Sequence, residues 1–292
     1  MAFKFKKTQS LAENLLRLYK KGAKKVVLAL DQSGGLPGIH EARKEIKRLR
    51  AVLRLLRPEM SGRDCRRAMR PLRKAAKLLG SPRDARVLLE TLNQLGSRFK
   101  GALPQKSLAH LKNMLVENCE TARTQFAGNH AARRVCRFLK KSQKRARKIS
   151  LKRKSRRRLE QNLGKSFAGS RTAFENAQAG QSPENFHEWR KRVQDVRNQI
   201  ELLDSRKGIS LTSDLKDLSQ ILGREHDIFM LREFVEAHYA GRAQKLKIRP
   251  LNESLKSFEE KLQVTALTRG TTFYGGSPFD LRSGSSATKL LS

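Results

Sequence analysis

The chain has 292 residues, enough to bury a substantial core and to form two domains or two half-domains. Its formal net charge of +37 and sequence pI near 11.1 lie far from those of an ordinary enzyme surface. A folded surface with this charge repels itself, which points to a polyanionic partner: nucleic acid, an anionic membrane or polyphosphate.

The cysteines and the hydropathy of the chain indicate in which cellular compartment the protein is expected. The three cysteines have no C-x-x-C spacing and no partnered histidines, so we expect reduced thiols and neither a disulfide framework nor a metal site. The N-terminus has no apolar stretch typical of a signal peptide, and the longest apolar run, residues 26–30, is too short to span a bilayer. These features predict a cytoplasmic protein without a membrane span.

The first predicted helix covers residues 8–30, where apolar side chains recur at helical spacing. A loop rich in Gly and Pro follows at 31–38, and the next helix runs from about His40 to Pro58. At about 100° per residue, one side of this second helix is apolar. The opposite side is a cationic stripe led by a histidine, made of His40, Arg43, Lys44, Lys47, Arg50 and Arg54.

Pro71 opens or kinks the third predicted helix, and Gly80 ends it. Cations at near-helical spacing on this helix are predicted to widen a basic groove: Arg66, Arg70, Arg73, Lys74 and Lys77. Ser81-Pro82-Arg83-Asp84 has the form of a helix start, and that helix reaches about Phe99. Another helix begins at Pro104 and breaks at Gly128.

Residues 133–158 contain fifteen Lys and Arg and no acid. Interspersed apolar residues such as Phe138 and Leu139 favour a helix with a solvated basic surface over a disordered tail. The run fits a nonspecific electrostatic surface equally well. Peripheral membrane binding is less favoured, because the run lacks the large exposed apolar residues of an interfacial helix.

The order of helix, Gly/Pro loop and His-led helix then returns. A helix at about 155–178 precedes a loop at 179–183, and His187, Arg190, Lys191 and Arg197 repeat the first stripe at a spacing of 147 residues. Three positions differ: Gln194, Asp195 and Glu201 stand where the first copy has Lys47, Arg48 and Arg54. Since acids repel a polyanion, we expect the first half to supply most of the binding.

A second pair of segments strengthens the repeat: Leu79-Gly80 before Arg83-Asp84, and Leu222-Gly223 before His226-Asp227. We expect both Asp residues to act structurally, as caps or salt-bridge partners. The sequence therefore predicts an all-α fold of two four-helix bundles related by an internal pseudo-two-fold repeat. The expected limits are residues 1–150 and 151–267, with a disordered tail at 268–292.

The pattern H-x-x-R-K-x-x-K-R-L-R with a later L-G-x-x-R-D resembles the CHAD family, the conserved histidine α-helical domain, over roughly residues 8–267. This resemblance implies a basic central groove or pore that binds inorganic polyphosphate, and localisation to polyphosphate granules. By position it implies binding by His40, Arg43, Lys44, Lys47, Arg48 and Arg50, and by His187, Arg190, Lys191 and Arg197. Regularly spaced phosphates suit rows of Lys and Arg, and a histidine at a helix start can donate beside free backbone N–H groups.

Catalysis is disfavoured because acids are scattered and no Walker loop, H-E-x-x-H or G-x-S-x-G motif is present. An enzyme acting on phosphoanhydrides needs carboxylates to hold a divalent ion. We therefore predict a binding module that uses no cofactor and no metal. The alternative is a nonspecific nucleic-acid-binding helical protein; aromatic residues at 6% weaken it, so nucleic acid is expected only as a weaker competitor.

Overall fold

The computed structural model describes residues 3–32, 36–96, 105–151, 156–203, 209–239 and 249–275. These residues form helices and no strand, which confirms the all-α prediction. In the first half the helices are α1 (Leu11–Gln32), α2 (Leu36–Leu55), the 3-10 turn η1 (Arg57–Glu59), α3 (Gly62–Leu78), α4 (Gly80–Gly96), α5 (Gln105–Gly128) and α6 (Ala131–Ala146). In the second half they are α7 (Arg156–Gly180), α8 (Pro183–Leu203), α9 (Ile209–Tyr239) and α11 (Arg249–Gly275).

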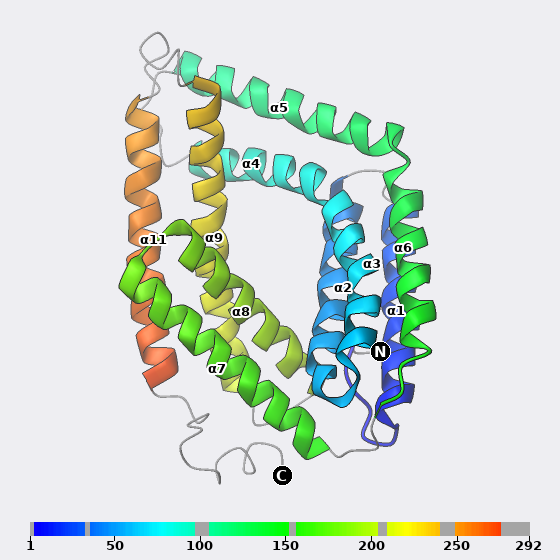
Figure 1. The fold of residues 1–292 in the computed structure, drawn as a ribbon. Coiled ribbons are helices and arrows are strands. Elements are labelled where there is room, and N and C mark those ends of the chain that lie inside the picture. The colour runs from blue at the N-terminus through cyan, green and yellow to red at the C-terminus, as the bar shows by residue number, and fades with distance from the viewer. Residues whose placement is uncertain are drawn as a thin grey trace.

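Two groups of helices face each other in Figure 1. On the right α1, α2, α3 and α6 pack as a bundle, with α2 and α6 each touching both α1 and α3. On the left α7, α8, α9 and α11 form the other group, in which α7 packs on α8 and α9 lies between α8 and α11. The apolar stripes on these helices explain the arrangement, because each stripe needs a partner that keeps it from water.

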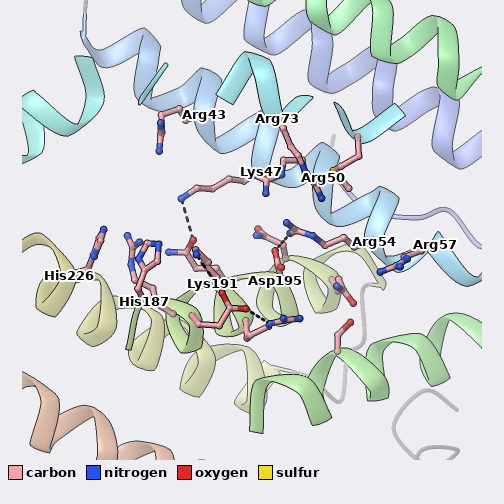
Figure 2. A pocket seen from close by; sticks show the side chains of 18 of the residues that line it. Arg43, Lys47, Arg50, Arg54, Arg57, Arg73, His187, Lys191, Asp195 and His226 are labelled. Carbon is pink, nitrogen blue, oxygen red and sulfur yellow. Dashed lines mark hydrogen bonds and ion pairs between the residues drawn. The ribbon is translucent and has the colours of Figure 1, made fainter. Parts of the chain in front are cut away.

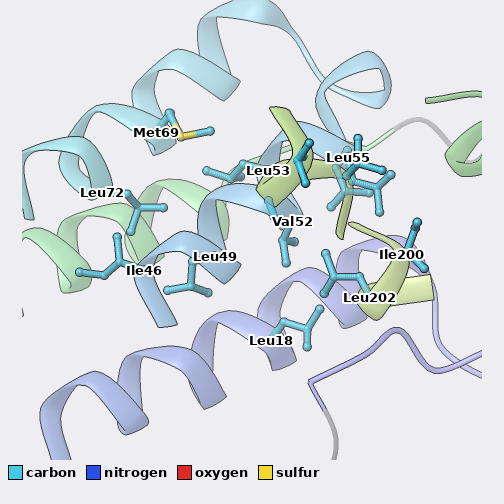
Figure 3. Close-up of a cluster of buried hydrophobic side chains, with 14 of the residues drawn as sticks. Leu18, Ile46, Leu49, Val52, Leu53, Leu55, Met69, Leu72, Ile200 and Leu202 are labelled. Atoms are coloured by element: carbon cyan, nitrogen blue, oxygen red, sulfur yellow. The ribbon is translucent and has the colours of Figure 1, made fainter. Parts of the chain in front are cut away.

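The two groups share one hydrophobic core. Leu53 and Leu55 of α2 belong to the same buried cluster as Ile200 and Leu202 at the end of α8, so the bundles are fused where these helices meet (Figure 3). Each fully buried side chain of this kind stabilises the fold by about 1.5–3 kcal/mol. The contact fixes α2 relative to α8, the two helices that carry the His-led stripes.

Helices α4 and α5 lie outside both groups and run between them near the top of Figure 1. Their leucines, among them Leu92 and Leu115, form a second buried cluster with α9 and α11, which includes Leu231 and Leu255. A segment that precedes residue 150 therefore packs against the second half of the chain.

Several helix limits differ from those predicted. Gly80 begins α4 instead of only ending α3, and Pro71 lies inside α3, which starts at Gly62 after Ser61 caps it through a hydrogen bond from the Asp64 N–H. The helix predicted within the basic run 133–158 ends at Ala146. No helix within the described ranges has the length and apolar content needed to cross a bilayer.

The tail predicted from residue 268 is helical as far as Gly275, because α11 continues there. Tyr274 is buried; its hydroxyl accepts a hydrogen bond from Trp189 Nε1 at 3.2 Å and lies 2.6 Å from Ser170 Oγ. Gly270 is required for this contact, since a Cβ there would lie 2.5 Å from Phe174. The glycine thus reflects close packing, not disorder, and residues 276–292 lie outside the described ranges.

Candidate anion-binding site

A cavity of about 1170 Å³ lies between the two bundles. Residues of α2, α3 and α4 line it on one side, and residues of α7, α8 and α9 on the other. Figure 2 shows Arg43, Lys47, Arg50 and Arg54 projecting from α2 toward α8. The lining contains twelve Lys and Arg against five Asp and Glu, so its net charge is strongly positive.

The local sequence explains why these cations face the cavity. Ile46 and Leu49 of α2 are fully buried in the first bundle, and Trp189 and Val193 of α8 are fully buried in the second. Because the side of a helix opposite a buried stripe faces away from the core, each basic stripe is turned toward the space between the bundles.

Nine of the predicted site residues line this cavity. They come from both His-led helices, which the repeat indicated, and from the neighbouring α3, whose cations the helical spacing indicated. These nine are Arg43, Lys47, Arg50, Arg54, Arg66, Arg73, His187, Arg190 and Lys191.

The other seven predicted residues lie outside the lining: His40, Lys44, Arg48, Arg70, Lys74, Lys77 and Arg197. Arg48 pairs with Glu45 at 2.8 Å, and Arg197 pairs with Glu201 at 3.1 Å. Lys44 is exposed beside Glu41, and His40, Arg70 and Lys77 are exposed. A stripe defined by helical spacing is wider than the strip that actually faces the cavity, so its edges point to solvent or to neighbouring acids.

The lining also contains functional groups that the stripes did not include: Arg57, Arg83, Lys165, Arg192 and His226. Arg83 and His226 belong to the two Leu-Gly-led segments, whose repetition was the signal that could have placed them in the site. Lys165 on α7 gives no such signal, because only the packing of α7 against α8 brings it to the cavity.

Four arginines surround Lys47 in the cavity. Burial, together with repulsion from Arg190, Arg43, Arg83 and Arg50, lowers the pKa of Lys47 to about 7. Its Nζ donates a hydrogen bond to Gln194 Oε1 at 3.2 Å, a neutral partner that offsets none of this charge. An anion in the cavity would therefore be attracted to Lys47 and would stabilise its charged form.

Three buried nitrogens of the lining have no hydrogen-bond partner among the described residues: Arg50 Nε, Arg190 Nε and His187 Nδ1. Buried polar groups are rarely left unpaired, because each costs free energy without an acceptor. All three lie on the two stripe helices and line the same cavity. Phosphate oxygens are acceptors that match the guanidinium groups especially well.

The histidines supply donors more than charge. The rings of His187 and His226 lie 4.6 Å apart between centroids. Burial lowers the pKa of both, that of His226 to about 3 with help from Arg190, so His226 is neutral at pH 7. A neutral imidazole still donates one N–H, which suits an anionic oxygen.

Three aspartates of the lining lie beside arginines. Asp195 forms an ion pair with Arg54, and Asp227 lies 3.8 Å from Arg83, which also contacts Asp84 at 3.3 Å. Both Leu-Gly-led acids therefore lie beside Arg83 as salt-bridge partners. No group of three or more His, Cys, Asp or Glu suited to a metal ion occurs in the ranges that the structure covers.

Comparison with known proteins places this geometry in a family. A family model described as the CHAD domain matches residues 31–236. The CHAD domain of the plant Ricinus communis has a TM-score of 0.70 at 15% identity, with 95% of this chain and 96% of that chain covered. PptA from Streptomyces chartreusis has a TM-score of 0.66 at 16% identity, with 91% and 100% covered. The chain matches none of the curated proteins.

Proposed function

Since the chain belongs to the CHAD domain family, we propose that its central cavity binds inorganic polyphosphate. The observation that carries the proposal is the cavity lining, with twelve Lys and Arg and three buried nitrogens that have no hydrogen-bond partner among the described residues. A linear chain of phosphates offers an anionic acceptor at every unit. It therefore satisfies many of these donors at once, which a single phosphate cannot do.

The lining favours polyphosphate over nucleic acid. Single-stranded nucleic acids are held by aromatic side chains on which bases stack, at about 1–3 kcal/mol per base. Phe229 is the one Phe, Tyr or Trp among the lining residues. A ligand without bases does not depend on stacking, so the scarcity of aromatic side chains does not weaken its binding. We therefore propose nucleic acid as a weaker competitor at most. Recruitment to polyphosphate granules would follow from this binding.

Removal of charge from the cavity tests the proposal. The variant Arg43→Met, Lys47→Met and Arg190→Met keeps the alkyl part of each side chain and removes three central cations. Charge-assisted hydrogen bonds are each worth about 1.5–3 kcal/mol, so affinity for polyphosphate should fall at least about 100-fold. Circular dichroism should be unchanged, because the substitutions relieve repulsion.

A matched control removes the same net charge elsewhere. Lys112, Lys256 and Lys261 are exposed on α5 and α11 and do not line the cavity. Their joint substitution by Gln should change the affinity only a few-fold. Equal losses from the cavity variant and from this control would refute the cavity as the binding site.

We further propose that binding occurs without hydrolysis. Four of the five carboxylates of the lining lie beside Lys or Arg, and no group of three or more His, Cys, Asp or Glu that could hold a metal ion occurs among the described residues. Incubation with polyphosphate and Mg²⁺ or Mn²⁺ should release no more orthophosphate than a mock preparation. Release well above that background would show the protein to be an enzyme.

A further inference from the structure

The most basic of the described helices takes no part in lining the cavity. Helix α6 carries seven Lys and Arg and no acid, and none of its residues lines the cavity. Exposed cations cover its outer side: Arg133, Arg134, Arg137, Lys140, Lys141 and Lys144. None of them forms an ion pair within the part of the chain that the structure describes.

Helix α3 connects this surface to the cavity. The two helices pack side by side: Arg145 Nη1 donates to the Arg67 carbonyl oxygen at 2.7 Å, and Lys74 Nζ lies 5.9 Å from the centroid of the Phe138 ring. At about 100° per residue, the cations of α3 follow one another around the helix. In order from the cavity wall toward α6 they are Arg73, Arg66, Lys77, Arg70, Arg63, Lys74 and Arg67.

This continuity decides what the outer surface fits. The one acid of α3, Asp64, lies at its capped N-terminal turn, so no carboxylate of α3 or α6 interrupts the cations between the cavity wall and α6. Within α6, like charges occur three and four residues apart, as in Arg137 with Lys140 and Arg137 with Lys141. Such pairs are mutually repulsive on a helix, and a polyanion lying over them would relieve the repulsion.

We propose that the exposed faces of α3 and α6 form an outer anion track, over which a long polyphosphate chain continues after it leaves the cavity. The inference rests on the proposed function of the cavity and extends it. The track has no exposed aromatic side chain for stacking bases, since Phe138 is half-buried under Lys74. It also has no exposed large apolar residue for a membrane, because Val135 and Leu139 are buried.

The proposal predicts a dependence on chain length. Tripolyphosphate is short enough to use the cavity alone, whereas long-chain polyphosphate would use both the cavity and the track. The outer variant Arg137→Gln, Lys141→Gln and Lys144→Gln should leave the affinity for tripolyphosphate within about twofold of the unaltered protein. Its affinity for long-chain polyphosphate should fall about tenfold or more.

Salt dependence gives a second readout. Affinity for a polyanion falls as salt rises, and each lost contact between a cation and a phosphate of a flexible chain makes the negative slope of log affinity against log salt less steep by about 0.7. The slope for long-chain polyphosphate should therefore be less steep by about 2 in the outer variant. The control is again the joint substitution of Lys112, Lys256 and Lys261 by Gln, which removes the same charge from surfaces away from the track.

The outcomes separate the two proposals. If the outer variant and the control lose equal affinity for the long chain, or if the outer variant loses affinity only for duplex DNA or RNA, the track is refuted while the cavity stands. If the unaltered protein binds neither tripolyphosphate nor long-chain polyphosphate, the proposed function fails and the track fails with it.

Discussion

Lys47 links the electrostatics of the cavity to pH. Its pKa is about 7 because it is buried and surrounded by arginines, so near neutral pH only part of the population carries the charge. A bound polyanion favours the charged form and raises this pKa. Binding therefore takes up a proton wherever the pH lies between the pKa of the free protein and that of the complex.

We accordingly expect the affinity for polyphosphate to fall as the pH rises through about 7. The fall is at most about tenfold per pH unit for one proton. In Lys47→Arg the guanidinium keeps its charge at all these pH values, so this part of the pH dependence should disappear. Titration calorimetry in buffers of different ionisation enthalpy measures the proton uptake; equal uptake by both proteins would exclude Lys47 as its source.

Asp195 is the acid that most directly opposes a ligand. It lines the cavity and forms an ion pair with Arg54, a cation that an anion would otherwise contact. Burial raises the pKa of Asp195, and Arg54, Arg50 and Arg192 offset that rise only in part. A polyanion reaching Arg54 must compete with this carboxylate.

Asp195→Asn should therefore bind polyphosphate about threefold to tenfold more tightly, since an attraction of order 1 kcal/mol becomes available to the ligand. The amide oxygen still accepts from Arg54, so the free energy of unfolding should change by less than about 1 kcal/mol. Glu201→Gln is the matched control, because Glu201 contacts Arg48 and Arg197 outside the cavity lining. An affinity increase shared by both variants, or absent from Asp195→Asn, would contradict the competition.

At the scale of elements, the contacts between α2 and α8 follow the internal repeat. Lys47 and Gln194 are equivalent positions, and they touch each other. In the repeat Arg48 is equivalent to Asp195, and Arg54 is equivalent to Glu201. The ion pairs are crossed: Arg54 contacts Asp195, and Arg48 contacts Glu201. This is the pattern expected of a local two-fold axis between α2 and α8, while the symmetry of the whole chain stays a prediction.

The departures of the second copy thus have a structural reason that the sequence alone did not reveal. Cations at all these positions in both copies would face each other across α2 and α8 and repel. The neutral Gln194 and the acids Asp195 and Glu201 turn these contacts into hydrogen bonds and ion pairs. The first half consequently supplies eight lining Lys and Arg and one acid, and the second half supplies four Lys and Arg and four acids.

We predict that removing cations from α2 weakens polyphosphate binding more than removing as many from α8. The matched variants are Arg43, Lys47 and Arg50 to Met, and Arg190, Lys191 and Arg192 to Met. In α8, Lys191 and Arg192 already contact Glu188, so they have less charge to offer a ligand. The α2 variant should lose about tenfold more affinity, measured by titration with helical content checked. Equal losses, or a larger loss from α8, would reject the asymmetry.

Sequence patterns located these helices well because both basic stripes lie opposite buried residues such as Ile46 and Trp189. Helical spacing alone could not separate Lys47, which faces the cavity, from Lys44, which faces solvent. That difference depends on the angle at which α2 meets α8. Lys165 required the packing of α7, a contact between elements that no local pattern encodes.

At the scale of the whole molecule, the core and the charge have separate roles. One buried cluster fuses the bundles at α2 and α8, and a second joins α4 and α5 to α9 and α11. These clusters hold the walls of the cavity apart at fixed positions. The fold can therefore present many cations around one space, although a net charge of +37 opposes compaction.

The central claim is that this space selects a chain of phosphates. Competition calorimetry with long-chain polyphosphate, ATP and duplex DNA, at about 150 mM salt where the screening length is about 8 Å, tests it most directly. The account predicts that polyphosphate binds at least about 100-fold more tightly than either competitor, a difference of about 2.8 kcal/mol. ATP or duplex DNA bound as tightly as polyphosphate under these conditions would contradict it.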